Sequence, residues 1–188
     1  GAGWAAQRPS FHPGEDAPRG AHRALTESMV PHHFVHEGIL LKRLPEFRAL
    51  IIPDQRYLAP EVVHALEPWV RAGGVLVATA LSGTLDQDYQ PSGRFALENL
   101  LGLRYERPYE QAHAYIEVTD ERLKAGTLDM AHLAEAPFAL AAPVADDVQV
   151  LARLRRIYLR SDGQSLLRWS PVGEDSGYPA ITVRPVGR

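Results

Sequence analysis

The sequence predicts an α/β domain built on a parallel sheet. Two apolar strands are predicted at residues 49–52 and 75–78, and a helical segment lies between them, which is the order of a right-handed strand–helix–strand crossover. A Gly73-Gly74 pair lies at the turn from the helix into the second strand. Both strands are apolar throughout, which is typical of a parallel sheet that is buried on both faces.

The segment before the first strand is predicted to begin with a helix. Pro18 suits a first helical turn, and Pro31 ends the helix because proline cannot donate the next backbone hydrogen bond. Apolar residues recur between them at the spacing of one helical face: Ala21, Ala24, Leu25 and Met29. Residues 32–36 then resemble a short strand, and residues 38–44 predict a brief helical turn.

The helix between the two strands is predicted to start at Pro60. Its apolar stripe would dock on the sheet and consists of Val62, Leu66, Trp69 and Val70. Pro68 lies inside this helix, so we expect a kink or an early loosening there. Gly73 is well placed to end the helix in the left-handed conformation, which glycine adopts without a steric cost.

After the second strand, residues 81–94 predict a polar loop and residues 95–101 a short helix. The apolar anchors of that helix are Phe95, Leu97, Leu100 and Leu101. Alternating residues predict strands at 103–109 and 113–118. Asp120 is expected to cap a helical turn that ends near residue 125.

The remainder of the chain is predicted to be rich in strands. Residues 127–147 are rich in alanine but carry two prolines, so a helix is only weakly indicated there. Further strands are predicted at 148–154, 157–160, 166–169 and 178–183, with residues 170–177 as a loop before the last one. We therefore expect a single domain over residues 1–188, in which the β-rich segment 104–175 is an insertion or an appended subdomain.

Composition excludes several classes of chemistry. The chain has 188 residues, which suits one α/β domain, and it contains no cysteine, which excludes disulfides, thiolate metal ligands and a cysteine nucleophile. The net charge of −3 gives no footprint for nucleic acid or for an anionic membrane. No apolar run approaches the roughly 20 residues of a membrane span. The first residues do not resemble a signal peptide, so we expect a cytoplasmic location.

Polar residues follow both predicted strands and form the candidate ligand-binding site. In open α/β sheets, ligands gather at the carboxyl ends of parallel strands. The candidates at these ends are Asp54, Arg56, Thr79, Ser82 and Asp86. The alternative for Asp54 is a structural role, in which its carboxylate holds the turn by accepting hydrogen bonds from local backbone amides.

A catalytic interpretation of the same region is a stand-alone hydrolase that uses Ser82 or the Asp86/Asp88 pair. Ser82-Gly83 invites comparison with a nucleophile elbow, but the first glycine of the G-x-S-x-G pattern is absent. We therefore assign no catalytic residue. The histidines of segment 32–36 lack the convergent ligands and helical spacing of a zinc site, so we expect no metal and no cofactor.

The run LIIPDQRYLAPEVVHALEPWVRAGGVLVATALSGTLDQ, followed by FALENLLGL, resembles the flavodoxin-like domain of class I glutamine amidotransferase type. It is most similar to the version fused to glycoside hydrolases, including the trimerisation domain of trimeric beta-galactosidases. The motifs in order are Ile52-Pro53-Asp54, Gly73-Gly74, Thr79 and Leu101-Gly102-Leu103. The resemblance implies a three-layer, doubly wound, mostly parallel sheet.

The resemblance also implies what this chain does not do. Glutamine amidotransferases use a cysteine nucleophile, and this chain has none. In the hydrolase-fused members, the domain lies beside a barrel of about 250 residues that holds the catalytic carboxylates. We therefore expect this chain to be one part of a larger carbohydrate-active protein.

Three functions are open at this point. The leading hypothesis is a non-catalytic, amidotransferase-like domain of a beta-galactosidase-like glycoside hydrolase, which serves oligomerisation or interdomain packing and shapes a neighbouring sugar site. Its partners would be other domains of the parent chain or further copies, with carbohydrate as a candidate ligand and neither nucleic acid nor membrane. The alternatives are the stand-alone hydrolase and a sugar or small-molecule binding module at the carboxyl edge of the sheet.

Overall fold

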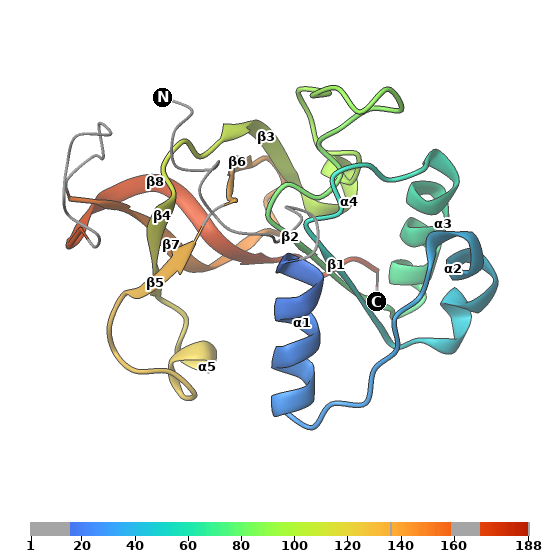
Figure 1. The fold of residues 1–188 in the computed structure, drawn as a ribbon, viewed down its shortest axis with the longest axis horizontal. Coiled ribbons are helices and arrows are strands. Elements are labelled where there is room, and N and C mark those ends of the chain that lie inside the picture. Colours follow the sequence, from blue (N-terminus) through green and yellow to red (C-terminus); the bar gives the residue numbers. More distant parts are fainter. Residues whose placement is uncertain (1–15, 136, 159–169, 188) are drawn as a thin grey trace. The chain divides into compact units, whose positions relative to one another are not determined.

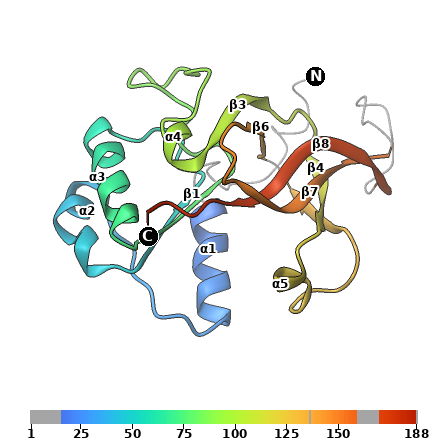
Figure 2. The same cartoon turned by 180° about the vertical axis from the view of Figure 1, so that it is seen from behind.

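The computed structural model describes residues 16–135, 137–158 and 170–187. These residues form two compact units. The N-terminal unit comprises residues 16–100 together with residues 185–187, and the β-rich unit comprises the described part of residues 101–184. Figures 1 and 2 show the ribbon from two opposite sides.

A parallel pair of strands is the centre of the N-terminal unit. Strands β1 (Ala49–Pro53) and β2 (Val75–Thr79) pair in parallel, with Ala49 opposite Val75. Helix α3 (Pro60–Arg71) connects them. The strand–helix–strand prediction is therefore confirmed, and the carboxyl ends of both strands meet at the same edge of the pair.

Helix α3 has the ends that the sequence predicts. Pro60 occupies the first turn, Val62 and Leu66 are buried, and the helix does not end at Pro68 but continues to Arg71. Gly73 then adopts φ +105°, the left-handed conformation that favours glycine. The next residue is crowded, because a Cβ on Gly74 would overlap the ring of Trp69. Trp69 therefore packs directly on the backbone of the Gly-Gly turn.

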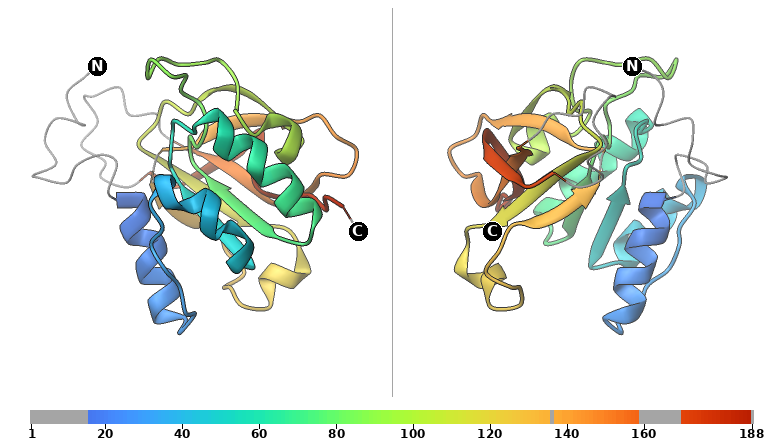
Figure 3. Two further views of the ribbon diagram at one scale, coloured as in Figure 1. Left: turned by 90° about the vertical axis from the view of Figure 1, so that its right-hand side faces the viewer. Right: turned by 60° about the vertical axis from the view of Figure 1, so that its left-hand side comes forward.

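The other helical elements of the N-terminal unit are α1 (Asp16–Glu27), α2 (Glu37–Arg43), the 3-10 turn η2 (Leu44–Glu46) and α4 (Glu98–Leu101), whose last residue is the first of the β-rich unit. Figure 3 shows α1 on one side of the β1–β2 pair and α2 and α3 on the other. The buried apolar residues of this unit are Leu40, Leu44, Ile52, Leu58, Val62, Leu66, Leu81, Phe95 and Leu97.

The strand predicted at residues 32–36 is wrong, since this segment has no regular secondary structure. Its histidine side chains instead form hydrogen bonds with the neighbouring backbone. The His32 ring lies 2.9 Å from the carbonyl of Val30, and His36 caps α2 by accepting a hydrogen bond from the amide of Gly38. Side chains that bond to the neighbouring backbone in this way compete with strand pairing.

The β-rich unit contains two antiparallel sheets. In the first, β3 (Leu103–Pro108) pairs with β6 (Ala139–Pro143). The second has the order β5-β4-β7-β8, and its strands are β5 (His132–Glu135), β4 (His113–Val118), β7 (Gln149–Ile157) and β8 (Val172–Val183). A short helix, α5 (Glu121–Lys124), is capped by the side chain of Asp120, as the sequence predicts.

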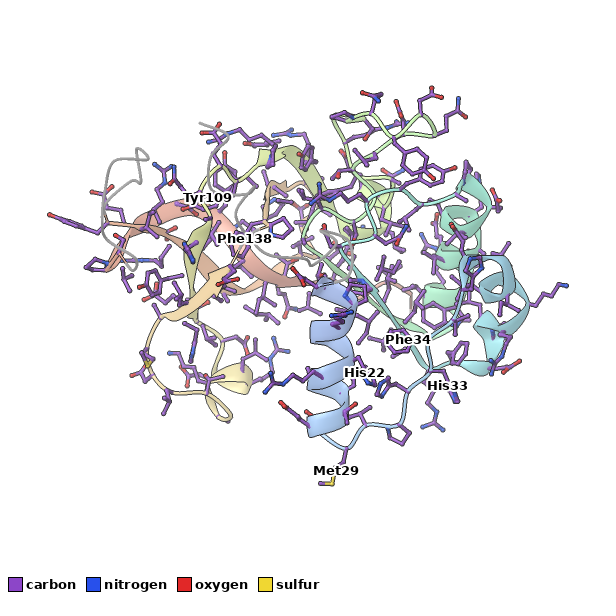
Figure 4. The ribbon with its side chains drawn as sticks, in the orientation of Figure 1. His22, Met29, His33, Phe34, Tyr109 and Phe138 are labelled. Carbon is purple, nitrogen blue, oxygen red and sulfur yellow. The ribbon has the colours of Figure 1, made fainter. Side chains whose placement is uncertain are left out.

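The two sheets share one apolar core. Ala114, Leu140 and Leu154 form its buried centre, and Tyr109 and Phe138, which are labelled in Figure 4, pack against it. Other members of this layer are Tyr178 and Ala180. The Tyr178 hydroxyl donates a hydrogen bond to the carboxylate of Glu106, and this bond raises the pKa of Tyr178 above its ordinary value.

Several predicted boundaries in this unit are wrong. The alanine-rich stretch contains β5 and β6 and no helix in its described residues, because strand pairing overrides the helix propensity of alanine. The two strands predicted at 148–154 and 157–160 form the continuous strand β7 as far as Ile157. Most of the predicted loop 170–177 belongs to β8. The strand predicted at 166–169 lies outside the described residues.

Candidate functional site

The loops that leave β1 and β2 are joined by the side chain of Asp54. Its side chain is only 5% exposed and accepts a hydrogen bond from the amide of Leu81, at 3.0 Å. Its own amide donates to the hydroxyl of Thr79, at 3.3 Å. Asp54 also has φ +52°, a conformation that aspartate tolerates better than most residues. Two predicted site residues, Asp54 and Thr79, are thus brought together at the strand ends.

Arg56 is the cationic member of this group. Its guanidinium lies 3.3 Å from Oδ2 of Asp54, and its side chain is 43% exposed. Because the arginine is open to water, this ion pair contributes little to stability by itself. The contact does fix the second carboxylate oxygen of Asp54, whose first oxygen already bonds to Leu81. The carboxylate of Asp54 therefore has a partner on each oxygen, a backbone amide of the loop after β2 on one and a guanidinium on the other.

Ser82 is buried rather than presented to solvent. Its residue is 2% exposed, and its hydroxyl lies 2.9 Å from the carbonyl of Ile52 and 2.7 Å from that of Thr79. One hydroxyl proton serves these two acceptors. A nucleophilic serine needs a base within hydrogen-bond reach. The partners of Ser82 in the described chain are carbonyl oxygens, so its geometry is that of a structural serine.

The turn after β2 is bonded to the loop after β1 along its backbone. The amide of Gly83 donates to the carbonyl of Gln55, and the amide of Leu85 donates to the carbonyl of Arg56, both at 3.0 Å. Thr84 is buried and donates its hydroxyl to the carbonyl of Leu81, at 2.7 Å. Both loops therefore form one hydrogen-bonded structure.

Asp86 organises the tip of the second loop. Its Oδ1 accepts hydrogen bonds from the amides of Asp88 and Gln90, both at 2.9 Å. Within the same turn Tyr89 has φ +58°, and its exposed ring lies 5.4 Å from the ring of Tyr57. An aspartate that accepts bonds from its own following amides is a common turn former. The sequence signal for this turn is Asp86 itself, because the two donors are backbone amides.

A pocket of about 610 Å³ lies beside these loops in the N-terminal unit. Of the five predicted site residues only Asp86 lines it, whereas Asp54, Arg56, Thr79 and Ser82 do not. The polar lining residues that the sequence analysis did not assign to a site include Tyr57, His64, Ser92, Arg94, Glu98 and Asn99. They were missed because they come from four separate segments, namely the loop after β1, α3, the end of the second loop and α4, which share a wall only after folding.

The histidines of segment 32–36 take part in ring contacts and caps. Within the described ranges, no group of three or more histidine, cysteine, aspartate or glutamate side chains is arranged to hold a metal ion. His32 instead contacts His22 of α1, with their ring nitrogens 2.7 Å apart. Figure 4 shows His22 next to Phe34, and the two ring centroids are 5.2 Å apart. The sequence analysis did not connect His22 with this group of histidines, because His22 lies ten residues before His32 in the sequence.

None of the helices in the described part of the chain is long and apolar enough to cross a membrane.

These observations define an α/β unit with a closely bonded pair of strand-end loops and a polar pocket beside them. The chain belongs to the beta-galactosidase trimerisation domain family, whose model matches residues 17–133. A comparison with curated protein sequences finds no match.

Several solved structures with a similar fold are glycoside hydrolases. The alpha-L-fucosidase isoenzyme 2 from Paenibacillus thiaminolyticus gives a TM-score of 0.72 at 20% identity, over 89% of this chain and 24% of that one. Gan42B, a GH42 beta-galactosidase from G. stearothermophilus, gives a TM-score of 0.64 at 15% identity, over 96% of this chain and 23% of that one. The beta-galactosidase from Bacillus circulans sp. alkalophilus gives a TM-score of 0.56 at 19% identity, over 77% of this chain and 19% of that one.

The present chain thus spans about a quarter or less of the length of these enzymes. At such identities the likeness concerns the fold alone.

Proposed function

We propose that this chain is a non-catalytic assembly domain of a beta-galactosidase-like glycoside hydrolase, and that it acts in the association of subunits or in the packing of neighbouring domains. The observation that carries the proposal is the match of the trimerisation-domain model over residues 17–133, which is more than half of the chain. The structural neighbours support it, because the chain corresponds to a minor part of each enzyme.

The geometry of the strand ends agrees with a non-catalytic role. Ser82 is buried against carbonyl oxygens, and the carboxylate of Asp54 accepts hydrogen bonds from a backbone amide and a guanidinium. The chain also lacks the cysteine on which the amidotransferase reaction depends. We propose on the resemblance described above that the N-terminal unit is an amidotransferase-like, flavodoxin-like three-layer domain, to which the β-rich segment 104–175 is an addition.

Assembly is tested by measuring the mass of the chain in solution. Sedimentation equilibrium over a wide range of concentrations should show a species three times the 20.8 kDa mass of one chain. A mass of one chain at every concentration would contradict self-association. Association with a separate barrel domain would then be measured by co-expressing the two domains and purifying them through a tag on one.

The pocket beside the strand-end loops favours a second candidate function, which is contact with a sugar. Its volume of about 610 Å³ falls within the range of small-molecule sites, and it combines the ring of Tyr57 with the carboxylates of Asp86, Asp88 and Glu98. Aromatic rings bind the apolar face of a pyranose, and carboxylates accept hydrogen bonds from its hydroxyls. In the assembled enzyme, such a pocket would shape a neighbouring sugar site.

A titration with methyl β-galactoside tests this candidate. Binding should shift NMR signals of the lining residues, and Asp88→Asn should weaken it several-fold, whereas Asp175→Asn in the β-rich unit should not. Asp88 is the better choice than Asp86, because the carboxylate of Asp86 builds the turn itself. Signals that stay unchanged at millimolar galactoside would remove the sugar candidate.

A further inference from the structure

Two histidines of the N-terminal unit direct their ring nitrogens at one another. His22 belongs to α1 and His32 to the segment that follows this helix, and Nδ1 of His22 lies 2.7 Å from Nε2 of His32. Figure 4 shows His22 extending from α1 toward this segment, with the ring of Phe34 beside it. We refer to His22 and His32 as the histidine pair.

The ring of His32 is held in one orientation through its other nitrogen. Nδ1 of His32 lies 2.9 Å from the carbonyl oxygen of Val30, and because a carbonyl only accepts hydrogen bonds, this nitrogen carries the hydrogen. Nε2 of the neutral ring therefore presents a lone pair to His22. Histidines that bind metals usually have this arrangement, in which the second ring nitrogen donates to a carbonyl or a carboxylate and fixes the tautomer.

The backbone and an aromatic ring support the pair from both sides. The amide of Val30 donates to the carbonyl of Leu25 at 2.9 Å, so the turn that carries the carbonyl partner of His32 is bonded to the end of α1. The ring of Phe34 lies 5.2 Å from the ring of His22 and 6.3 Å from that of His32, measured between centroids. The two imidazoles are thus brought together by local structure.

We propose that the histidine pair is a binding site for a divalent transition metal ion such as zinc. Imidazole nitrogens suit zinc, nickel and copper, whereas magnesium and calcium prefer oxygen ligands. The sequence analysis expected no metal from the histidines of segment 32–36, but the second ligand comes from α1. Since no group of three or more such ligands occurs in the described residues, we assign two protein ligands and expect water in the remaining positions.

The geometry of the pair is close to what zinc requires. Zinc lies about 2.0–2.1 Å from each imidazole nitrogen, which places the two nitrogens of a tetrahedral site about 3.3 Å apart. The pair reaches this separation when the nitrogens move apart by about 0.6 Å, and the exposed side chain of His22 is able to turn. The hydrogen on Nδ1 of His22 passes to Nε2 of the same ring, which stays neutral.

A metal ion at this position fastens α1 to the segment that follows it. None of the residues of α1 is buried, so the helix has little apolar packing of its own. A ligand that binds only the folded protein stabilises it. The proposal goes beyond the assembly function and is independent of it, because neither histidine lines the pocket beside the strand-end loops.

Isothermal titration calorimetry of the whole chain with zinc chloride, after treatment with a chelator, measures the binding. We expect one zinc ion per chain with a dissociation constant in the micromolar range, and no binding of magnesium. His22→Ala and His32→Ala should each raise this constant at least tenfold. His33→Ala is the matched control, because His33 is the next residue but not a member of the pair, and it should leave the constant unchanged.

A second variant separates metal binding from the hydrogen bond between the two rings. His22→Gln keeps a side-chain amide that can donate to Nε2 of His32, but an amide is a poor zinc ligand. Zinc at a hundredfold excess over the dissociation constant should raise the melting temperature of the wild-type chain by about 5 °C or more. The same zinc concentration should shift the His22→Gln variant by less than about 1 °C. Amides of α1 should exchange more slowly with deuterated solvent when zinc is bound to the wild-type chain.

Three results would overturn the proposal. A wild-type chain that zinc neither binds nor stabilises contains no such site. A dissociation constant that stays the same in the His22→Ala and His32→Ala variants means that other residues hold the metal. An equal rise in melting temperature for the wild-type chain and the His22→Gln variant means that His22 only donates a hydrogen bond.

Discussion

Replacing Asp54 should separate a structural role for this carboxylate from a ligand-binding one. Asp54→Ala removes both oxygens that bond to Leu81 and Arg56, and it leaves a residue with a Cβ at φ +52°. Asp54→Asn keeps an acceptor oxygen and tolerates the same backbone conformation, but it removes the negative charge. The alanine variant should therefore lose much more stability than the asparagine variant.

The size of the effect follows from the contacts. A hydrogen bond from an amide to a buried carboxylate contributes about 1.5–3 kcal/mol, and the Asp54 side chain is 5% exposed. The left-handed backbone costs alanine about 1 kcal/mol more than aspartate. The ion pair with the half-exposed Arg56 adds less than about 1 kcal/mol. We expect a loss of about 3 kcal/mol for alanine and about 1 kcal/mol for asparagine.

Urea unfolding followed by the fluorescence of Trp69 measures this difference in the N-terminal unit. Trp69 lies in α3 beside the Gly-Gly turn, and the other two tryptophans, Trp4 and Trp169, are replaced by phenylalanine so that one unit reports alone. Unfolding free energies of the alanine and asparagine variants that agree within about 0.5 kcal/mol would refute the structural role, given the uncertainty of extrapolation.

Three further predictions concern packing and ionisation. Gly74→Ala should destabilise the N-terminal unit by about 1–3 kcal/mol in the same assay, because its methyl group would overlap the ring of Trp69; a neutral effect would contradict that packing. Leu66→Ala should cost about 2–5 kcal/mol, since Leu66 is fully buried, and a loss below about 1 kcal/mol would mean that the helix is not docked. The hydrogen bond to Glu106 raises the pKa of Tyr178. The stability that this bond adds to the folded state is therefore complete below about pH 10, the ordinary tyrosine pKa, and it is lost as the pH rises through the raised pKa. Glu106→Gln should lower that pKa in an ultraviolet titration of tyrosinate, and an unchanged titration would contradict the contact.

The parts of the fold that local sequence specifies were predicted well. Strands β1 and β2 are short apolar runs bounded by turn residues, and Pro60 and Gly73 mark the two ends of α3. These signals depend on the residue itself, because proline fixes φ and glycine alone enters the left-handed region freely. Asp120 belongs to the same class, since a cap is a bond between near neighbours.

The parts that depend on distant partners were predicted poorly. Residues 139–143 read as a weak helix, yet they form β6, which pairs with β3 more than thirty residues earlier. Likewise β7 is continuous because it pairs with both β4 and β8. Pairing between distant strands decides such segments, and alanine has no strong preference that opposes it.

The candidate site shows the same division. The sequence located the strand ends correctly, and it offered a structural role for Asp54, but it did not foresee that the amide bonded to this carboxylate belongs to the other loop. It did not reveal that Ser82 is buried, because Ser82 is buried against the carbonyl of Ile52, which lies thirty residues earlier in the sequence. Nor did it find His64 or Glu98 on the wall of the pocket, since each lies on a helix that reaches the wall only in the fold.

The bonds between the two strand-end loops have a consequence for recognition. Amides of Leu81, Gly83 and Leu85 are all held by groups of the loop after β1. A surface that is already ordered loses little conformational entropy when a partner or ligand binds to it. The same bonds should make these three amides exchange slowly with deuterated solvent. A rigid surface at this edge would therefore favour slow dissociation from one partner whose shape already fits it. It would be poorly suited to binding many different partners by changing its shape.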